Sequence, residues 1–193
     1  MKRFLILLLL LSCGKGINRA KDFPFNKGYV LVDHNGNKRS LRDFQGSVLV
    51  VGYIYTHCPD ICPLITDNMR KIYHLAAKEG ILNKGVLFLS ITFDPKRDKP
   101  EVLRDYMKVY EIDTASAWLF LTGEEKTIDS LMKDLNIVVD FGPMQISESG
   151  DTTYFITHTD RIHVVGRDGK IKAYFKGSEA KAEEVLEIIK REM

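Results

Sequence analysis

Residues 48–64 read VLVVGYIYTHCPDICPL, in which an apolar run of strand length leads directly into two closely spaced cysteines, Cys58 and Cys62. After them, apolar residues recur at helical spacing over residues 64–78. A strand that ends at a helix start brings both sulfurs to one place, and the helix dipole favours their thiolate forms. The stretch therefore predicts a redox or soft-metal site at the end of a central strand.

A second, nearly continuous apolar run follows at residues 86–92. Runs of this kind are typical of central strands that are covered on both faces. Strand, helix and strand in this order predict a βαβ unit around the cysteine pair.

The remaining elements extend this unit at both ends. The pattern predicts a hairpin with an Asn35-Gly36 turn and a second hairpin with an Asp168-Gly169 turn. Two further helices and one strand lie between them, and a closing helix follows the second hairpin. The predicted ranges are hairpin strands 29–33 and 38–40, helix 100–110, strand 118–121, helix 124–135, hairpin strands 162–165 and 171–175, and helix 179–192. Residues 138–153 show only weak alternation and receive no assignment. The order predicts an α/β, thioredoxin-like fold, with a central mixed sheet flanked by helices and an N-terminal β-hairpin.

The N-terminus reads as an export signal. Basic residues precede an apolar run that is too short to span a bilayer, and Cys13 then stands where bacterial lipoprotein signals carry the lipidated cysteine. We expect a lipoprotein signal peptide at residues 1–12, a tether at 13–22 and one domain at 23–193. Lipid on Cys13 would leave one pair among the three cysteines. An ordinary secretory signal is the alternative.

The charge balance limits the kinds of partner. The chain has 28 Lys and Arg against 26 Asp and Glu, without a polybasic run. This excludes the electrostatic pattern that nucleic-acid binding requires, so partners must be sought at the cysteine site.

The C-x-x-x-C spacing leaves two chemistries open. Sulfurs four residues apart can form a disulfide or share a soft metal ion such as copper(I) or zinc, with a third donor such as imidazole completing the site. A purely structural disulfide is a further alternative in an exported protein.

Four motifs resemble the Sco/SenC family of copper-binding, thioredoxin-like proteins. CPDICP at 58–63 matches its C-P-D-x-C-P, DPKRDKP at 94–100 is similar to its D-P-x-R-D-x-P, LTG at 121–123 matches its L-T-G, and His158-Thr159 stands at its distant histidine. The resemblance covers residues 23–193 in the expected order.

The resemblance implies a copper chaperone for the dinuclear copper centre of cytochrome c oxidase. Its copper ligands would be Cys58, Cys62 and His158, and its cargo Cu(I) or Cu(II). Its partners would be the copper-accepting subunit of the oxidase and a periplasmic thiol reductant or copper donor. We expect the protein to lie on the periplasmic side of the cell envelope, lipid-anchored at Cys13. The alternative is a thiol-disulfide oxidoreductase that uses Cys58 and Cys62 as a redox pair to reduce the acceptor's cysteines.

Two departures from expected patterns bear on this choice. Thioredoxin-type reductases keep a proline before the strand that faces the cysteines, whereas the last proline here is Pro143 and the loop carries His158 instead. A histidine there favours metal over disulfide exchange. The family usually has an acidic residue before this histidine, where the chain has Thr157, and Asp160 could replace its contact. A thiol peroxidase is disfavoured, since two close cysteines would quench each other.

Several other polar residues could also contribute to the site. His57 could lower a thiol pKa or bind metal, and Asp60 could be a weak oxygen donor or a docking contact. His163 is expected to point into or across the sheet, while His34 and His74 are expected at the surface. Asp94, Arg97 and Asp98 either shape the site or form a solvated turn that caps the following helix.

Overall fold

The computed structural model describes residues 21–193 except 114, 116, 144 and 147–151. The expected signal peptide at 1–12, Cys13 and the tether up to residue 20 lie outside the described residues. Within the described part, none of the helices has the length and apolar character needed to cross a bilayer.

A seven-stranded mixed sheet forms the body, in the order β11-β10-β3-β4-β5-β1-β2. The three central strands are parallel, and β10 and β1 pair antiparallel to them on either side. The bounds are β1 Val30–Asp33, β2 Lys38–Ser40, β3 Val48–Ile54, β4 Val86–Thr92, β5 Trp118–Thr122, β10 Ile162–Val165 and β11 Ile171–Phe175. This confirms the mixed sheet and the N-terminal hairpin predicted from the sequence.

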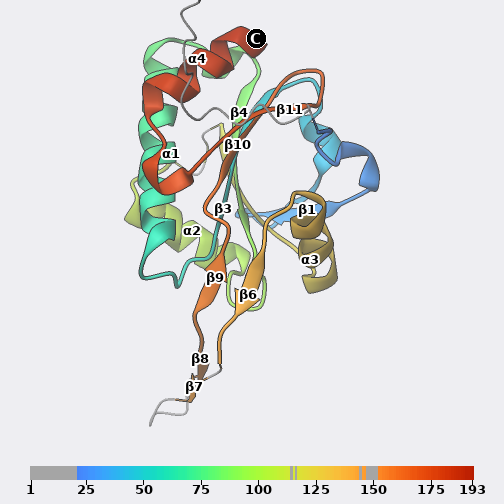
Figure 1. Ribbon diagram of the computed structural model, residues 1–193, viewed down its shortest axis with the longest axis vertical. Coiled ribbons are helices and arrows are strands. Elements are labelled where there is room, and N and C mark those ends of the chain that lie inside the picture. Colours follow the sequence, from blue (N-terminus) through green and yellow to red (C-terminus); the bar gives the residue numbers. More distant parts are fainter. Residues whose placement is uncertain (1–20, 114, 116, 144, 147–151) are drawn as a thin grey trace, which may run out of the picture.

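Helices cover both faces of the sheet. Helices α1, α2 and α4 lie on one face, and α3 lies on the other (Figure 1). Their bounds are α1 Ile61–Lys78, α2 Pro100–Val109, α3 Glu125–Asp134 and α4 Ala182–Glu192, with 3-10 turns at Phe25–Lys27, Leu41–Phe44, Leu82–Lys84 and Gly177–Glu179. Helix α1 begins earlier than predicted, so that Cys62 falls in its first turn, and α4 begins later because residues 177–179 form a separate turn.

Close packing fixes α1 against the sheet. All seven residues of β3 are buried. A Cβ atom at Gly52 would lie 2.3 Å from Sδ of Met69 on α1, so only glycine permits this approach. The first turn of α1 is thereby held at the carboxyl end of β3.

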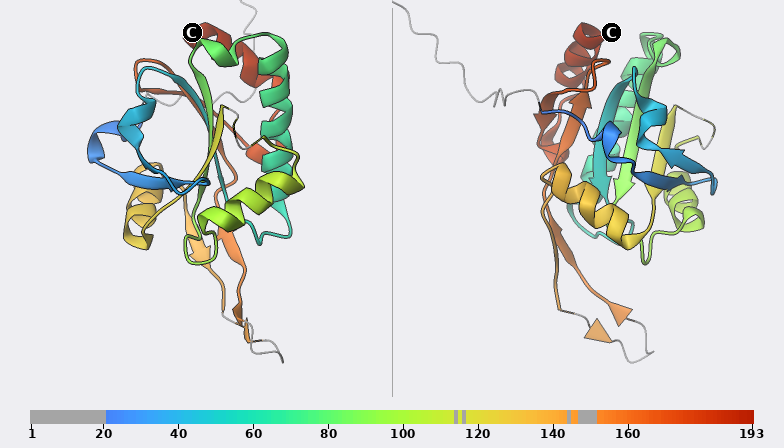
Figure 2. Two further views of the ribbon diagram at one scale, coloured as in Figure 1. Left: turned by 180° about the vertical axis from the view of Figure 1, so that it is seen from behind. Right: turned by 90° about the vertical axis from the view of Figure 1, so that its right-hand side faces the viewer.

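A β-arm projects from this body, and we name its four short strands the histidine arm (Figures 1 and 2). Strand β6 (Val139–Phe141) pairs antiparallel with β9 (Ile156–His158), and β7 (Gln145–Ile146) pairs with β8 (Thr152–Thr153) further out. Strands β6, β7 and β8 lie in the region 138–153 that the sequence left unassigned, and the stretch expected to be the loop carrying His158 includes strand β9. These strands are too short for alternation to identify them.

Candidate metal centre

The two cysteines lie at the junction of β3 and α1. The Cys62 side chain is buried in the first turn of α1, while Cys58 is half-buried in the loop before it. The backbone N–H of Tyr55 donates to Cys62 Sγ at 3.4 Å, and that of Cys62 donates to Cys58 Sγ at 3.5 Å. Both sulfurs therefore receive donors from the backbone where strand passes into helix.

His158 is the last residue of β9 and reaches this junction from the histidine arm. Its Nε2 lies 3.3 Å from Cys62 Sγ, although the two residues are 96 apart in sequence. Its Nδ1 lies 3.1 Å from the carbonyl oxygen of Thr159. Because a carbonyl only accepts, Nδ1 carries the proton and the Nε2 lone pair faces the sulfurs.

One donor atom each from Cys58, Cys62 and His158 lie within 4.8 Å of one another. Two sulfurs and an imidazole nitrogen with a free lone pair form a soft donor set that suits copper(I) and could also hold zinc. The structure thus brings together the three residues that the sequence singled out, and their role as ligands stays a prediction.

The thiols of the pair differ in acidity. The hydrogen bond from Cys62 holds the pKa of Cys58 well below its usual range against the opposing effect of burial, with further help from the backbone N–H groups of Cys62 and Asp60. Burial raises the pKa of Cys62 far above its usual range, and the negative Cys58 adds to this. The metal-free pair therefore loses its first proton more readily from Cys58 than from Cys62.

Two aromatic residues pack around the imidazole of His158. The Phe93 ring lies 4.5 Å from it between centroids, and the Tyr55 ring meets it edge-on at 6.2 Å. The Tyr55 hydroxyl accepts a hydrogen bond from the Ile156 backbone N–H at 3.3 Å, and burial raises its pKa to about 12. Neither residue was predicted from the sequence; the only signal is that Tyr55 ends the first central apolar run and Phe93 directly follows the second.

The residues beside Cys58 are turned away from the sulfurs or exposed. Nδ1 of His57 lies 2.9 Å from the Thr56 hydroxyl and 3.9 Å from Asp98, and its side chain is 54% exposed. Asp60 is exposed at the start of α1 and makes no side-chain capping bond. Neither is placed among the three donors, and the hypothesised metal and docking roles stay predictions.

The solvated-turn hypothesis for the DPKRDKP stretch is wrong. Asp94 and Asp98 are buried, and α2 has no side-chain cap. Asp98 accepts hydrogen bonds from Thr56 and Thr92, while Asp94 accepts from Arg97 and from Tyr154. The stretch is an ordered connector next to the site.

The other histidines lie elsewhere. His163 is buried on β10 with its Nδ1 2.8 Å from the Tyr53 hydroxyl, which confirms that it points into the sheet. His74 is exposed on α1 as expected. The expectation for His34 is wrong, since it is fully buried and its Nδ1 accepts from the Phe120 backbone N–H at 3.3 Å. Its hairpin packs against β5 and does not stand free in solvent.

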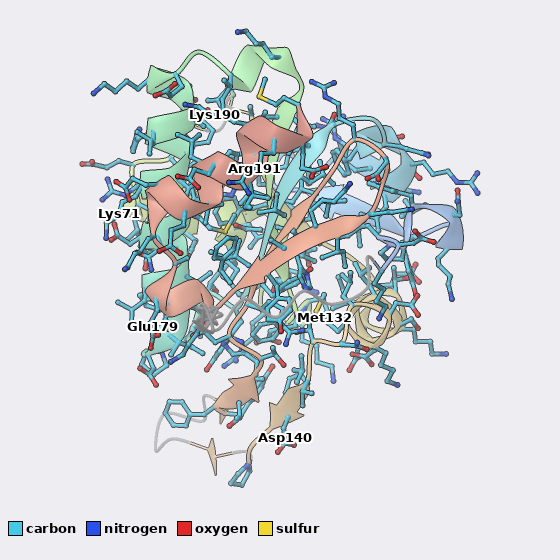
Figure 3. The ribbon with its side chains drawn as sticks, turned by 45° about the horizontal axis from the view of Figure 1, so that its top comes forward. Lys71, Met132, Asp140, Glu179, Lys190 and Arg191 are labelled. Carbon is cyan, nitrogen blue, oxygen red and sulfur yellow. The ribbon has the colours of Figure 1, made fainter. Side chains whose placement is uncertain are left out.

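The group that contacts Nδ1 of His158 is not Asp160, which the sequence suggested for this role. The Asp160 carboxylate is engaged by the backbone N–H and hydroxyl of Ser178, whereas the Thr159 carbonyl contacts His158. Thr157 stands directly across from Asp140 on β6. Asp140 is labelled in Figure 3. An acidic residue therefore lies opposite the position where the family usually carries one.

A groove of about 590 Å³ runs beside the histidine arm. It is lined by Phe93, by Met132 of α3 (Figure 3), and by Val139 and Phe141 of β6. Since Phe93 also packs on His158, the groove adjoins the histidine side of the site.

Comparison with known proteins adds independent information. The family model described as SCO1/SenC matches residues 18–193. The mitochondrial SCO2 homologue of Danio rerio is 32% identical over 147 residues, which are 76% of this chain and 50% of that protein; the chain thus spans about half its length.

Two solved structures share the fold. A SCO1/SenC family lipoprotein from Bacillus anthracis str. Ames has a TM-score of 0.74 and 26% identity, with 91% of this chain and 98% of that chain covered. Bradyrhizobium japonicum ScoI with copper bound has a TM-score of 0.71 and 25% identity, with 86% and 98% covered. The likeness confirms the thioredoxin-like architecture predicted from the sequence.

Proposed function

The chain belongs to the SCO1/SenC family, and on that premise we propose that it is a copper chaperone that binds copper through Cys58, Cys62 and His158. The observation that carries the proposal is the convergence of these three donors within 4.8 Å. A structural neighbour of the same family is described with copper bound, which supports copper over zinc.

Copper is the cargo, and the chain's own groups prepare its site. The Thr159 carbonyl holds the His158 proton on Nδ1, so that Nε2 is free to bind metal. The backbone N–H groups of Tyr55 and Cys62 stabilise negative charge on the sulfurs. Copper binding displaces the proton of Cys62, and a Cys58–Cys62 disulfide would block loading, which makes loading dependent on the redox state.

The exposures of the donors suggest the order of transfer. Cys58 and His158 are partly exposed while Cys62 is buried. A ligand of the acceptor can therefore approach from the Cys58 and His158 side, and Cys62 is the last donor to release copper. We infer from the family resemblance that the acceptor is the copper-accepting subunit of cytochrome c oxidase.

A second function is favoured by the unequal acidity of the two thiols. A half-buried Cys58 thiolate beside a buried Cys62 thiol is the division of roles that a disulfide reductase uses. Cys58 would attack an acceptor disulfide and release one acceptor thiolate. Cys62 would then lose its proton and attack Cys58 Sγ, which yields the Cys58–Cys62 disulfide and the fully reduced acceptor. A periplasmic thiol reductant would restore the pair.

We further propose that residues 1–12 are a lipoprotein signal, that Cys13 carries lipid, and that residues 13–22 tether the domain 23–193 to the periplasmic side of a membrane. Asp22 bridges to Lys170 in the turn between β10 and β11. Val165 at the end of β10 pairs with Leu49 near the start of β3, so this turn lies at the opposite end of β3 from Cys58. Such a tether would direct the copper site away from the membrane, towards a protruding acceptor domain.

Anaerobic Cu(I) titration of the reduced protein against a competing chelator tests the chaperone proposal. We expect one tightly bound Cu(I) per chain, with affinity reduced about 10- to 100-fold in His158→Ala. His74→Ala, at an exposed histidine on α1, is the matched control and should bind as the parent does. Loose binding by the parent, or parent-like binding by His158→Ala, would favour the reductase instead.

A further inference from the structure

The connector between β4 and α2, residues 94–98, contacts both halves of the copper site. It is the DPKRD part of the motif, in which Asp94 and Asp98 are buried, Arg97 is partly buried and Lys96 is exposed, and it contributes none of the three donors. Its side chains reach the loop of Cys58 in one direction and the histidine arm in the other.

Asp98 fastens the connector to the cysteine loop. Its buried carboxylate accepts from the Thr56 backbone N–H at 3.1 Å, from the Thr56 hydroxyl at 2.5 Å and from the Thr92 hydroxyl at 2.5 Å. Thr56 stands two residues before Cys58, so these bonds hold the start of the cysteine loop against the end of β4. Hydrogen bonds to a buried carboxylate are among the stronger ones in proteins.

Asp94 and Arg97 fasten the same connector to the histidine arm. The Tyr154 hydroxyl donates to Asp94 at 2.8 Å, and Arg97 pairs with Asp94 through its Nε. The Arg97 guanidinium also lies 3.7 Å above the Tyr154 ring and donates to the Tyr154 carbonyl oxygen at 3.5 Å. Tyr154 is thus held by its hydroxyl, ring and backbone, four residues before His158.

The arm depends on such contacts because the body's sheet does not hold it. In the described part of the chain, β9 pairs only with β6, and neither strand joins the seven-stranded sheet. Besides the contacts at Tyr154, the arm meets the site through the Ile156 to Tyr55 hydrogen bond and the tilted packing of Phe93 on His158.

We propose that residues 94–98 are a positioning bracket that sets the distance between His158 and the two cysteines by gripping the arm at Tyr154 and the cysteine loop at Thr56. This inference rests on the proposed copper chaperone function. Asp94, Arg97, Asp98 and Tyr154 are positioning residues in it, since they act on copper only through the donors that they hold.

A copper-free measurement tests the grip itself. Backbone hydrogen exchange of the reduced protein is followed at Ile156 on the arm and at Thr56 in the cysteine loop, because exchange reports local opening. Tyr154→Leu is expected to speed exchange at Ile156 about tenfold without changing Thr56, and Asp98→Asn is expected to do the reverse. Tyr174→Leu is the matched control, since Tyr174 also lies under an arginine, Arg161, at 4.9 Å but belongs to β11.

A double-mutant cycle then tests the effect on copper. Tyr154→Leu is expected to weaken Cu(I) binding of the reduced protein about tenfold, and to change it less than about twofold when His158→Ala is already present. Tyr154→Phe keeps the ring under Arg97 and should recover part of the loss.

The outcomes separate the bracket from the copper function. Unchanged exchange at Ile156 in Tyr154→Leu would overturn the bracket, and so would an equal affinity loss with and without His158. If exchange at Ile156 is faster in Tyr154→Leu but the parent protein binds Cu(I) loosely, the positioning role of the bracket is supported and the copper function is refuted.

Discussion

The two halves of the proposed copper site are built in different ways. The cysteine half belongs to the body of the protein, where β3 is wholly buried and Cys62 lies in the first turn of an eighteen-residue helix. The histidine half belongs to the arm, where His158 ends a three-residue strand whose Thr157 is exposed. One half is part of the core, and the other is brought to it by a few side-chain contacts.

The comparison indicates that affinity and stability are controlled separately. Changes near the cysteines act on the packing of α1 on β3 and so affect the whole domain. Changes on the arm can alter where Nε2 lies while the seven-stranded sheet remains intact. In such a site the core fixes the two sulfur donors, whereas the position of the histidine donor can change with the arm.

The largest effect is expected from Cys62→Ser. It removes the most buried donor and replaces a soft ligand by a hard hydroxyl, so Cu(I) affinity should fall more than about 1000-fold, which corresponds to about 4 kcal/mol. Chelator competition on the reduced protein measures it. A loss smaller than that of His158→Ala would contradict the view that the cysteine half dominates.

Gly52→Ala tests the packing of the cysteine half. The added Cβ would meet Met69 Sδ at 2.3 Å, so the buried Met69 side chain or α1 must shift, and the free energy of unfolding should fall by about 3 kcal/mol. Urea denaturation measures this. Gly36→Ala, where no atom lies within 4 Å but the φ of 84° adds strain, is the comparison and should cost less.

The cysteine half could be predicted from the sequence because its signals are local and strong. The apolar run at 48–55 and the helical spacing after it identify the βαβ unit, and the sulfurs follow from their place between them. The start of α1 was predicted three residues too late, because the first turn contains Pro63 and lacks a regular apolar spacing.

The histidine half could be predicted only through the family resemblance. Nothing in the spacing of Val138 to Thr153 marks strand β6, which pairs with the strand of His158, and the approach of His158 to Cys62 spans 96 residues. The burial of His34, Asp94 and Asp98 was also unforeseen, because polar residues read as surface when their tertiary partners are unknown.

The pH dependence of the free energy of unfolding tests the burial of His163 in the body of the protein. Burial, with smaller contributions from Arg161 and Lys21, lowers the pKa of His163 from 6.5 to about 3. The unfolded chain therefore takes up a proton below pH 6.5 that the folded chain does not, and stability should fall by about 2 kcal/mol between pH 6.5 and 5. His163→Gln should flatten this part of a urea-denaturation pH profile; an unchanged slope would show that other groups cause it.

The smallest effect is expected on the arm itself. Thr157→Asp would place a carboxylate directly across from Asp140, which should weaken the β6 and β9 pairing by about 0.5 kcal/mol. Because Nδ1 of His158 already donates to Thr159, Cu(I) affinity should change less than about threefold. Thermal denaturation and chelator competition check the two parts, and a large gain in affinity would show that the carbonyl does not replace the acidic residue.

X-ray absorption spectroscopy of the Cu(I)-loaded protein tests the central claim most directly, because it counts the donor atoms around the metal. The account predicts two sulfurs and one imidazole nitrogen in the parent, and two sulfurs without that nitrogen in His158→Ala. A parent spectrum with sulfur donors alone, or one that His158→Ala leaves unchanged, would contradict a site shared between the body and the arm.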